Sequence, residues 1–161
     1  MYISHNWLKE FLKIDLKIDQ ISEILTDIGL EVEGVRQYQN FHGGLEGLII
    51  GKVLSCIKHP NADRLKITTV DVGDIAPLQI VCGAPNARVG IKVPCARVGA
   101  KLDKFEIKKA KLRGVDSSGM LCSAKEINIS NESEGILELN KNSKVGESIK
   151  NCLSLDDQIY H

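Results

Sequence analysis

The first 40 residues carry a helical pattern of apolar positions, followed by a short alternating one. Ser4 can cap a first helix, whose apolar residues recur at helical spacing: Trp7, Leu8, Phe11 and Leu12. A second helix is expected after Asp19, a good N-cap, and Gly29 ends its apolar face of Ile21, Ile24, Leu25 and Ile28. Residues 30–35 alternate apolar and polar side chains, which predicts a strand. We therefore expect residues 1–40 to form a small α/β unit.

Beyond residue 44 the pattern changes from helical to extended. Runs rich in β-branched and aliphatic residues follow, separated by Gly, Pro, Asn and Asp: 48–57, 66–72, 78–82, 91–98, 105–112 and a short, late run at 135–139. Short strands between such turns predict a small, closed or nearly closed β-barrel, because closure removes exposed strand edges. Pro94 indicates an edge or a bulge in the fourth run. We expect a mainly β fold with a five-stranded barrel over residues 41–153, after a junction at His42-Gly43-Gly44, and a further segment starting at residues 154–161.

Charge is segregated along the chain although the net charge of the 161 residues is zero. Residues 1–40 carry four basic and seven acidic side chains (−3), and residues 114–161 carry four and eight (−4). Between them, residues 41–100 carry seven and four (+3), and residues 101–113 carry six and two (+4). A middle segment of +7 can create a local positive field for an anionic partner, provided that its charges converge on one face. The alternative is a solvated, lysine-rich surface.

Other features of the composition bound the location and the chemistry. No apolar run approaches the ~20 residues of a membrane span, and the five cysteines are odd in number and widely spaced. We therefore expect a cytoplasmic protein with reduced thiols and no membrane partner. The sequence contains no phosphate-binding loop, HExxH or GxSxG motif, and Pro60 between His59 and Asp63 argues against a metal pair on a helix. We expect no catalytic residue, no metal site and no cofactor in this chain alone.

Three segments are more specific than the composition requires. The first, KHPNADRLK, starts at Lys58 and places cations around a proline turn; the second, VCGAPN, ends at Asn86; the third, IKKAKLRGVDSSGMLCS, starts at Ile107. Strand alternation in the third places Lys109, Lys111 and Arg113 on one face, whereas Lys108 points inward or is reoriented by a bulge. The hydroxyls of Ser117 and Ser118 can meet phosphate or ribose oxygens. The alternative is that these residues only make a barrel corner.

These three segments resemble the EMAP II-like tRNA-binding domain, an OB-fold module, over roughly residues 41–153. ISHNWLKEFL and LTDIGLEVEGV in the first 35 residues resemble the start of the bacterial phenylalanine–tRNA ligase beta subunit, as do CGAPN and MLCSAKE. The chain departs from the family at Leu102-Asp103-Lys104, where a proline–glycine turn is common.

The resemblance implies a tRNA-binding, N-terminal part of a longer beta subunit. Its partners would be tRNA, the remaining beta domains and the alpha subunit of an α2β2 ligase. That ligase charges tRNA with phenylalanine using ATP and Mg²⁺, and its aminoacylation site lies in the alpha subunit.

Few aromatic residues are available in residues 41–161 to stack on unpaired bases: Phe41, Phe105, which we expect in the core, and Tyr160. We therefore expect weak, salt-sensitive contact with phosphate and ribose of folded tRNA. The candidate RNA-binding residues are Lys58, Arg64, Lys66, Asn86, Lys108, Lys109, Lys111, Arg113, Ser117 and Ser118. Two alternatives stay open: a structural interaction module of the synthetase, favoured by the acidic residues between Glu126 and Glu138, and a free-standing tRNA-binding protein of the same fold.

Overall fold

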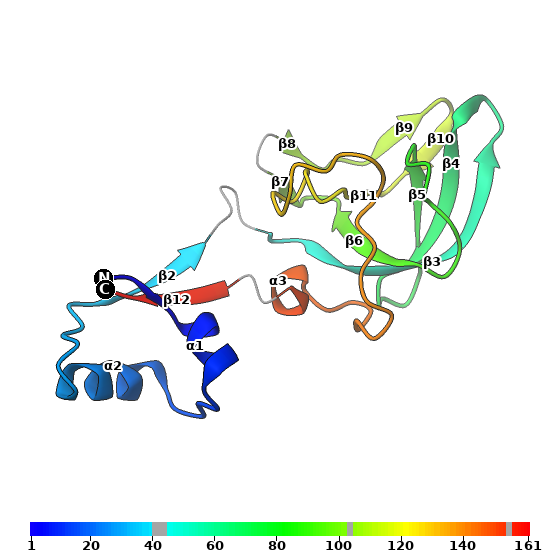
Figure 1. Ribbon diagram of the computed structural model, residues 1–161. Coiled ribbons are helices and arrows are strands. Elements are labelled where there is room, and N and C mark those ends of the chain that lie inside the picture. The colour runs from blue at the N-terminus through cyan, green and yellow to red at the C-terminus, as the bar shows by residue number, and fades with distance from the viewer. Residues whose placement is uncertain (40–44, 103–104, 154–155) are drawn as a thin grey trace. The chain divides into compact units, whose positions relative to one another are not determined.

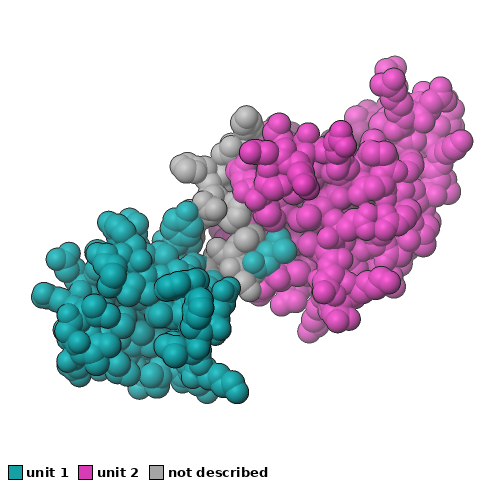
Figure 2. Space-filling model, in the orientation of Figure 1, with its two compact units in different colours: residues 1–40, 153–161 teal, residues 41–152 magenta. Residues whose placement is uncertain are grey.

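The computed structural model describes residues 1–39, 45–102, 105–153 and 156–161. Two compact units divide the chain: residues 1–40 together with 153–161, and residues 41–152 (Figure 2). The expected junction at residues 42–44 lies outside the described residues, as does Phe41.

The amino-terminal unit combines two helices with a three-stranded sheet. Helix α1 (His5–Phe11) begins as expected, because the Ser4 Oγ accepts a hydrogen bond from the Trp7 N–H at 3.0 Å. Helix α2 (Ile18–Asp27) begins two residues earlier than the sequence indicates, with Lys17 rather than Asp19 at the N-cap. It ends before Gly29, whose φ of +97° is a conformation that glycine adopts without strain.

The strands of this unit come from three places in the sequence. The sheet order is β1-β12-β2, from β1 (Ile3–Ser4), β12 (Asp156–Tyr160) and β2 (Val35–Gln39). The strand expected at residues 30–35 was therefore placed too early. The sequence analysis expects a further segment to start at residues 154–161, whereas β12 is the central strand of this sheet. No apolar pattern predicts that pairing, because β12 starts with two charged residues, Asp156 and Asp157.

The second unit is built around a five-stranded antiparallel sheet with the order β11-β6-β3-β4-β5 (Figure 1). Its strands are β3 (Leu48–His59), β4 (Ala62–Asp71), β5 (Leu78–Cys82), β6 (Lys92–Arg97) and β11 (Gly119–Leu121). The backbone N–H of Ser118, just before β11, donates to the Gln79 carbonyl of β5 at 2.9 Å. That bond joins the two ends of the sheet, so the expected small, nearly closed barrel is confirmed. Fully buried aliphatic side chains fill its core: Val53, Val70, Ile80 and Val93.

The fifth barrel strand is β11 and not the run at residues 105–112. That run divides into β8 (Phe105–Glu106), which pairs with β7 (Lys101–Leu102), and β9 (Ala110–Leu112), which pairs with β10 (Val115–Ser117). Among residues 105–112 only Ile107 is buried, so this run has too few inward side chains to form a barrel wall.

Two further expectations for the barrel were wrong. Residues 135–139 form no strand, although the Leu137 and Leu139 amides bond to carbonyls of Cys122 and Lys92. Pro94 lies in β6, between β3 and β11, and not at an edge. The Pro94 carbonyl accepts from the N–H of Cys122, the residue after the end of β11. The proline, which has no N–H to donate, therefore lies where the pairing between β6 and β11 ends. A short helix, α3 (Ile149–Cys152), follows the barrel.

Candidate nucleic-acid interface

The turn between β3 and β4 consists of Pro60 and Asn61, because His59 pairs with Ala62 across it. Proline has a φ suited to the first turn position and has no N–H to leave unpaired. The N–H of Asn61 donates to Nδ1 of His59 at 3.1 Å. The His59 side chain is only 5% exposed, so this turn is held from within by a buried imidazole.

A second two-residue turn joins β9 and β10. Arg113 and Gly114 occupy it with φ values of +49° and +93°. Positive φ at both central residues defines a type I′ turn, whose twist suits a tight β-hairpin, and glycine at the second position relieves its strain. All residues from Lys108 to Gly114 are exposed, so the hairpin projects its cations into solvent.

The tips of the two hairpins contact each other. Nε2 of His59 lies 3.0 Å from the carbonyl oxygen of Leu112, and the Asn61 Nδ2 donates to the Arg113 carbonyl at 3.5 Å. Figure 1 shows both hairpins ending on the same side of the barrel. Segments about fifty residues apart in the sequence thus form one surface, which we call the joined hairpin tips (residues 58–64 and 111–114).

Six of the predicted RNA-binding cations are exposed: Lys58, Arg64, Lys108, Lys109, Lys111 and Arg113. Their charged groups make no hydrogen bond or ion pair with the residues that the structure describes. Of the two expectations for Lys108, an inward position is wrong, because the residue is exposed. Four of the six lie on the joined hairpin tips, which bring cations from two separate motifs close together.

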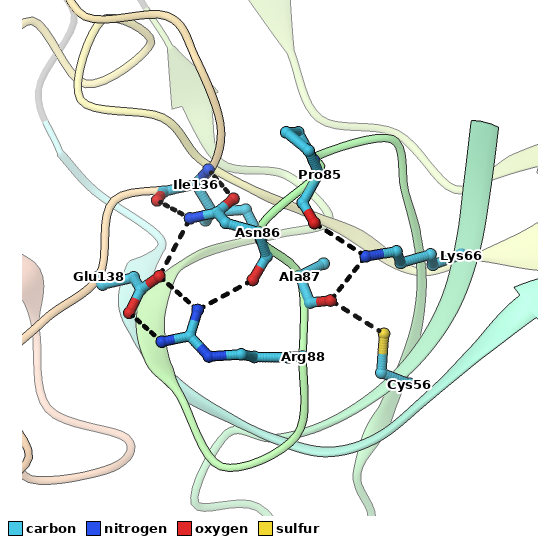
Figure 3. A network of polar contacts seen from close by, with 8 residues as sticks. All are labelled: Cys56, Lys66, Pro85, Asn86, Ala87, Arg88, Ile136 and Glu138. Carbon is cyan, nitrogen blue, oxygen red and sulfur yellow. Dashed lines mark hydrogen bonds and ion pairs between the residues drawn. The ribbon is translucent and has the colours of Figure 1, made fainter.

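Lys66 is occupied inside the domain (Figure 3). Its ammonium group donates to the carbonyls of Pro85 and Ala87 at 3.0 and 2.8 Å, and the thiol of Cys56 lies 3.4 Å from the same Ala87 oxygen. These contacts fasten the loop after β5 to the barrel. Lys66 therefore has a structural role that the sequence did not indicate, and contact between Lys66 and RNA stays a prediction.

Asn86 likewise makes its hydrogen bonds within the domain (Figure 3). Its Nδ2 donates to the Ile136 carbonyl at 2.9 Å and to Glu138 Oε1 at 3.2 Å, and its Oδ1 accepts from the Ile136 N–H at 2.8 Å. Arg88 binds both carboxylate oxygens of Glu138, at 2.6 and 2.7 Å, and this pairing holds the pKa of Glu138 below its usual range. An acidic residue expected to repel RNA is thus largely balanced within the domain.

Ser117 and Ser118 differ from the expectation that their hydroxyl and N–H groups are available to RNA. Ser117 is 3% exposed, and its hydroxyl accepts from the Val81 N–H and donates to the Gly119 carbonyl, both at 3.1 Å. It joins β10 to β5, so Ser117 has a structural role in this fold, and contact between Ser117 and RNA stays a prediction. The N–H of Ser118 is used in closing the barrel, which leaves only its half-buried side chain for the predicted contact.

A cleft of about 970 Å³ opens between the loop after β5, the segment from β8 to β9, and β11. Phe105 lines it and is 48% exposed, which corrects its expected place in the core. The charged residues of the cleft are one lysine and three glutamates: Lys108, Glu106, Glu126 and Glu134. The field in this cleft is therefore unfavourable to a polyanion, in contrast to the joined hairpin tips.

His59 and Asn61 are the site residues that the sequence analysis did not identify. Both belong to the HPNADRL segment, whose pattern predicts only a proline turn surrounded by cations. The signal was a histidine directly before a Pro-Asn turn, a position from which an imidazole can bond both its own turn and a neighbouring chain.

The described residues contain no group of three or more His, Cys, Asp or Glu side chains that could hold a metal ion. Across the same residues, no helix combines the length and the apolar character needed to cross a membrane.

The model of one protein family, described as "Putative tRNA binding domain", matches residues 48–148. A phenylalanine–tRNA ligase beta subunit of Aromatoleum aromaticum is 48% identical over 160 residues, covering 99% of this chain and 20% of the relative. One of Bacteroides thetaiotaomicron is 53% identical over 143 residues, covering 86% and 17%. The chain spans about a fifth of the length of these relatives.

Solved structures with a related arrangement include a MetRS-related protein of Pyrococcus horikoshii. It has a TM-score of 0.48 and 22% identity, over 63% of this chain and 87% of that one. The C-terminal domain of Plasmodium vivax p43 gives a TM-score of 0.46 and 24% identity, over 62% and 56%.

Proposed function

The chain belongs to the family of putative tRNA-binding domains and is homologous to phenylalanine–tRNA ligase beta subunits, and on that premise we propose that its joined hairpin tips bind the tRNA backbone. The observation that carries this proposal is the contact between the tips through His59. That contact joins the ends of two hairpins that carry four exposed cations, none of them paired with a described residue: Lys58, Arg64, Lys111 and Arg113. Cations at the ends of two adjoining hairpins can each neutralise a phosphate of one RNA strand.

Backbone contact is favoured over reading of unpaired bases. Sequence-tolerant binding of single strands uses several aromatic side chains in a row, each worth about 1–3 kcal/mol. In the described part of the second unit, Phe105 is the only aromatic residue, and it lies on the cleft that carries three glutamates. One aromatic ring in an acidic cleft cannot form a stacking surface for several bases. Recognition therefore depends on the shape and charge of the RNA backbone.

The proposal gives a definite salt dependence. If four phosphates are neutralised, the logarithm of the association constant falls with the logarithm of salt concentration with a slope of roughly −3, taking about 0.7 for each phosphate. A slope near zero would contradict binding through these cations.

A double charge reversal tests the proposal directly. Lys111→Glu with Arg113→Glu changes two of the four cations, and we expect the affinity for tRNA at low salt to fall at least tenfold. Lys141→Glu with Lys144→Glu is the matched control, because both lysines are exposed, lie outside the hairpin tips, and change the net charge equally. If both double variants lose the same affinity, only net charge matters and the proposed site is wrong.

We also propose the context in which this binding acts. The chain would serve within a cytoplasmic phenylalanine–tRNA ligase, where the alpha subunit and other beta domains charge tRNA with phenylalanine using ATP and Mg²⁺. The homology to beta subunits supports this context. The described residues offer no carboxylate cluster for the metal, so no step of that reaction is assigned to them. In an assembled ligase, the double charge reversal should raise KM for tRNA and leave kcat unchanged.

An interaction module is the second candidate, and the amino-terminal unit favours it. Trp7 and Phe11 pack edge to face with ring centroids 5.0 Å apart, yet they are 55% and 68% exposed. Exposed aromatic side chains of this kind are typical of surfaces that dock on another protein. Equal tRNA affinity of the parent and of a Lys109→Glu/Lys111→Glu variant would favour this second function.

A further inference from the structure

We propose that His59 is a positioning residue for RNA binding: its imidazole bridges the two hairpin tips, so that one stretch of RNA backbone meets the cations of both. This inference rests on the proposed tRNA-binding function and names a residue that determines its geometry. His59 would make no contact with RNA itself, because its side chain is 5% exposed.

The hydrogen bonds around the ring determine which nitrogen carries the proton. The N–H of Asn61 can only donate, so Nδ1 of His59 must accept it and is unprotonated. The Leu112 carbonyl can only accept, so Nε2 must carry the hydrogen that bridges the hairpins. One neutral tautomer thus satisfies both contacts, one within its own turn and one across to β9.

The bridge matters because the β9–β10 hairpin is a two-stranded ribbon of three residues in each strand. Such short hairpins are marginal without further contacts. The base of this hairpin is held at β5, where Ser117 bonds to Val81 and the Gln79 amide donates to the Asp116 carbonyl at 2.8 Å. Near its tip, Leu112 is held by His59, supplemented by the longer Asn61 contact to Arg113.

Loss of the bridge should therefore weaken RNA binding without removing a cation. With the tips joined, Lys111 and Arg113 lie beside the RNA backbone as soon as Lys58 and Arg64 contact it. With the tips apart, Lys111 and Arg113 are no longer held beside the backbone that Lys58 and Arg64 contact, and their two phosphate contacts are lost.

Two substitutions of His59 separate the bridge from the turn. In His59→Gln, the side-chain amide reaches the position of Nε2 and can donate to Leu112, but the acceptor for Asn61 is lost. In His59→Asn, the side-chain oxygen takes the position of Nδ1 and accepts from Asn61, but nothing reaches Leu112. Each variant thus keeps one of the two contacts of the imidazole.

We expect tRNA affinity at low salt to stay within about twofold of the parent for His59→Gln and to fall about tenfold for His59→Asn. The salt slope of His59→Asn should shrink by about 1.4, which corresponds to two lost phosphate contacts. Amide hydrogen exchange in β9 should be faster in His59→Asn and unchanged in His59→Gln, because among the described residues the bridge is the hydrogen bond that ties β9 to a strand outside its own hairpin.

The outcomes separate this inference from the proposed function. A parent chain that binds no tRNA at low salt overturns the proposed function itself. A parent that binds with both variants equal to it, or with His59→Asn stronger than His59→Gln, overturns the bridge alone. If either variant fails to fold, ¹⁵N NMR of the parent imidazole decides: protonation at Nε2 is required, and protonation at Nδ1 refutes the inference.

Discussion

Replacement of Asn86 separates a structural residue from an RNA-binding one. Asn86 satisfies both backbone groups of Ile136, a residue that is 5% exposed, and also donates to Glu138. In Asn86→Ala, the N–H and the carbonyl of Ile136 lose their partners inside the domain. Each of these two part-buried hydrogen bonds is worth about 1–2 kcal/mol, and the third adds little because it is exposed to water. We therefore expect the free energy of unfolding to fall by about 2–4 kcal/mol.

Urea denaturation followed by circular dichroism measures this change. With a slope of about 2 kcal/mol per molar urea, the midpoint should fall by about 1–2 M. Asn151→Ala is the matched control, because Asn151 is exposed and makes no side-chain hydrogen bond within the described residues, so its effect should stay within about 0.5 kcal/mol.

The Asn86→Asp variant tests whether the side-chain N–H donors of Asn86 are needed for stability. In Asn86→Asp, one oxygen still accepts from the Ile136 N–H, but the other meets the Ile136 carbonyl and the Glu138 carboxylate. We expect at least the loss seen for Asn86→Ala at neutral pH, with partial recovery when acid protonates the new carboxyl group.

RNA binding by the folded Asn86→Ala protein should equal that of the parent. Lower tRNA affinity with unchanged stability would refute this reasoning and would make Asn86 a binding residue.

Three more predictions test the packing of each unit. Burial raises the pKa of the Cys95 thiol to about 12. Alkylation of the native protein at pH 8, followed by mass spectrometry, should therefore be slow at the three buried cysteines, Cys82, Cys95 and Cys122. Rapid labelling of all five cysteines would contradict their burial in the core. Burial lowers the pKa of His5, which bonds to the Tyr160 hydroxyl at 2.8 Å, so the unfolded chain binds the proton more readily. Stability of the amino-terminal unit should then be full above about pH 6.5 and decrease below it, followed by the fluorescence of the single tryptophan; the same decrease in His5→Gln would contradict this cause. A Cβ at Gly51 would lie 2.6 Å from a Val70 methyl group, so Gly51→Ala should lower the unfolding free energy by about 1–3 kcal/mol, whereas Gly83→Ala, where the nearest atom lies at 3.4 Å, should change it little; equal effects would mean that β3 has room.

The barrel was predictable where strands alternate regularly and fill a core. β3, β4, β5 and β6 coincide with aliphatic runs ended by Gly, Pro or Asp, and burial of their inward side chains drives both the pattern and the fold. β11 was missed because it has three residues and begins with a glycine, so no periodicity marks it. β12 was missed because its place in the sheet depends on pairing with strands more than a hundred residues earlier.

The candidate site was predictable as a set of cations but not as an arrangement. Motif and charge identified Lys58, Arg64, Lys111 and Arg113, and the structure exposes all four. Motif and charge could not distinguish Lys66 from the exposed cations. Its ammonium group donates to two backbone carbonyls, and every residue has a carbonyl, so no sequence pattern predicts that contact. The bridge through His59 was likewise hidden, because it joins two turns that only the folded chain brings together.

Mapping of tRNA contacts by ¹⁵N NMR at low salt tests the central claim most directly. On titration with tRNA, the account predicts amide shifts centred on residues 58–64 and 108–114, which diminish as salt is added, and no comparable shifts at Lys141 and Lys144. Shifts centred on the acidic cleft or on the amino-terminal unit, or shifts that persist at high salt, would contradict it.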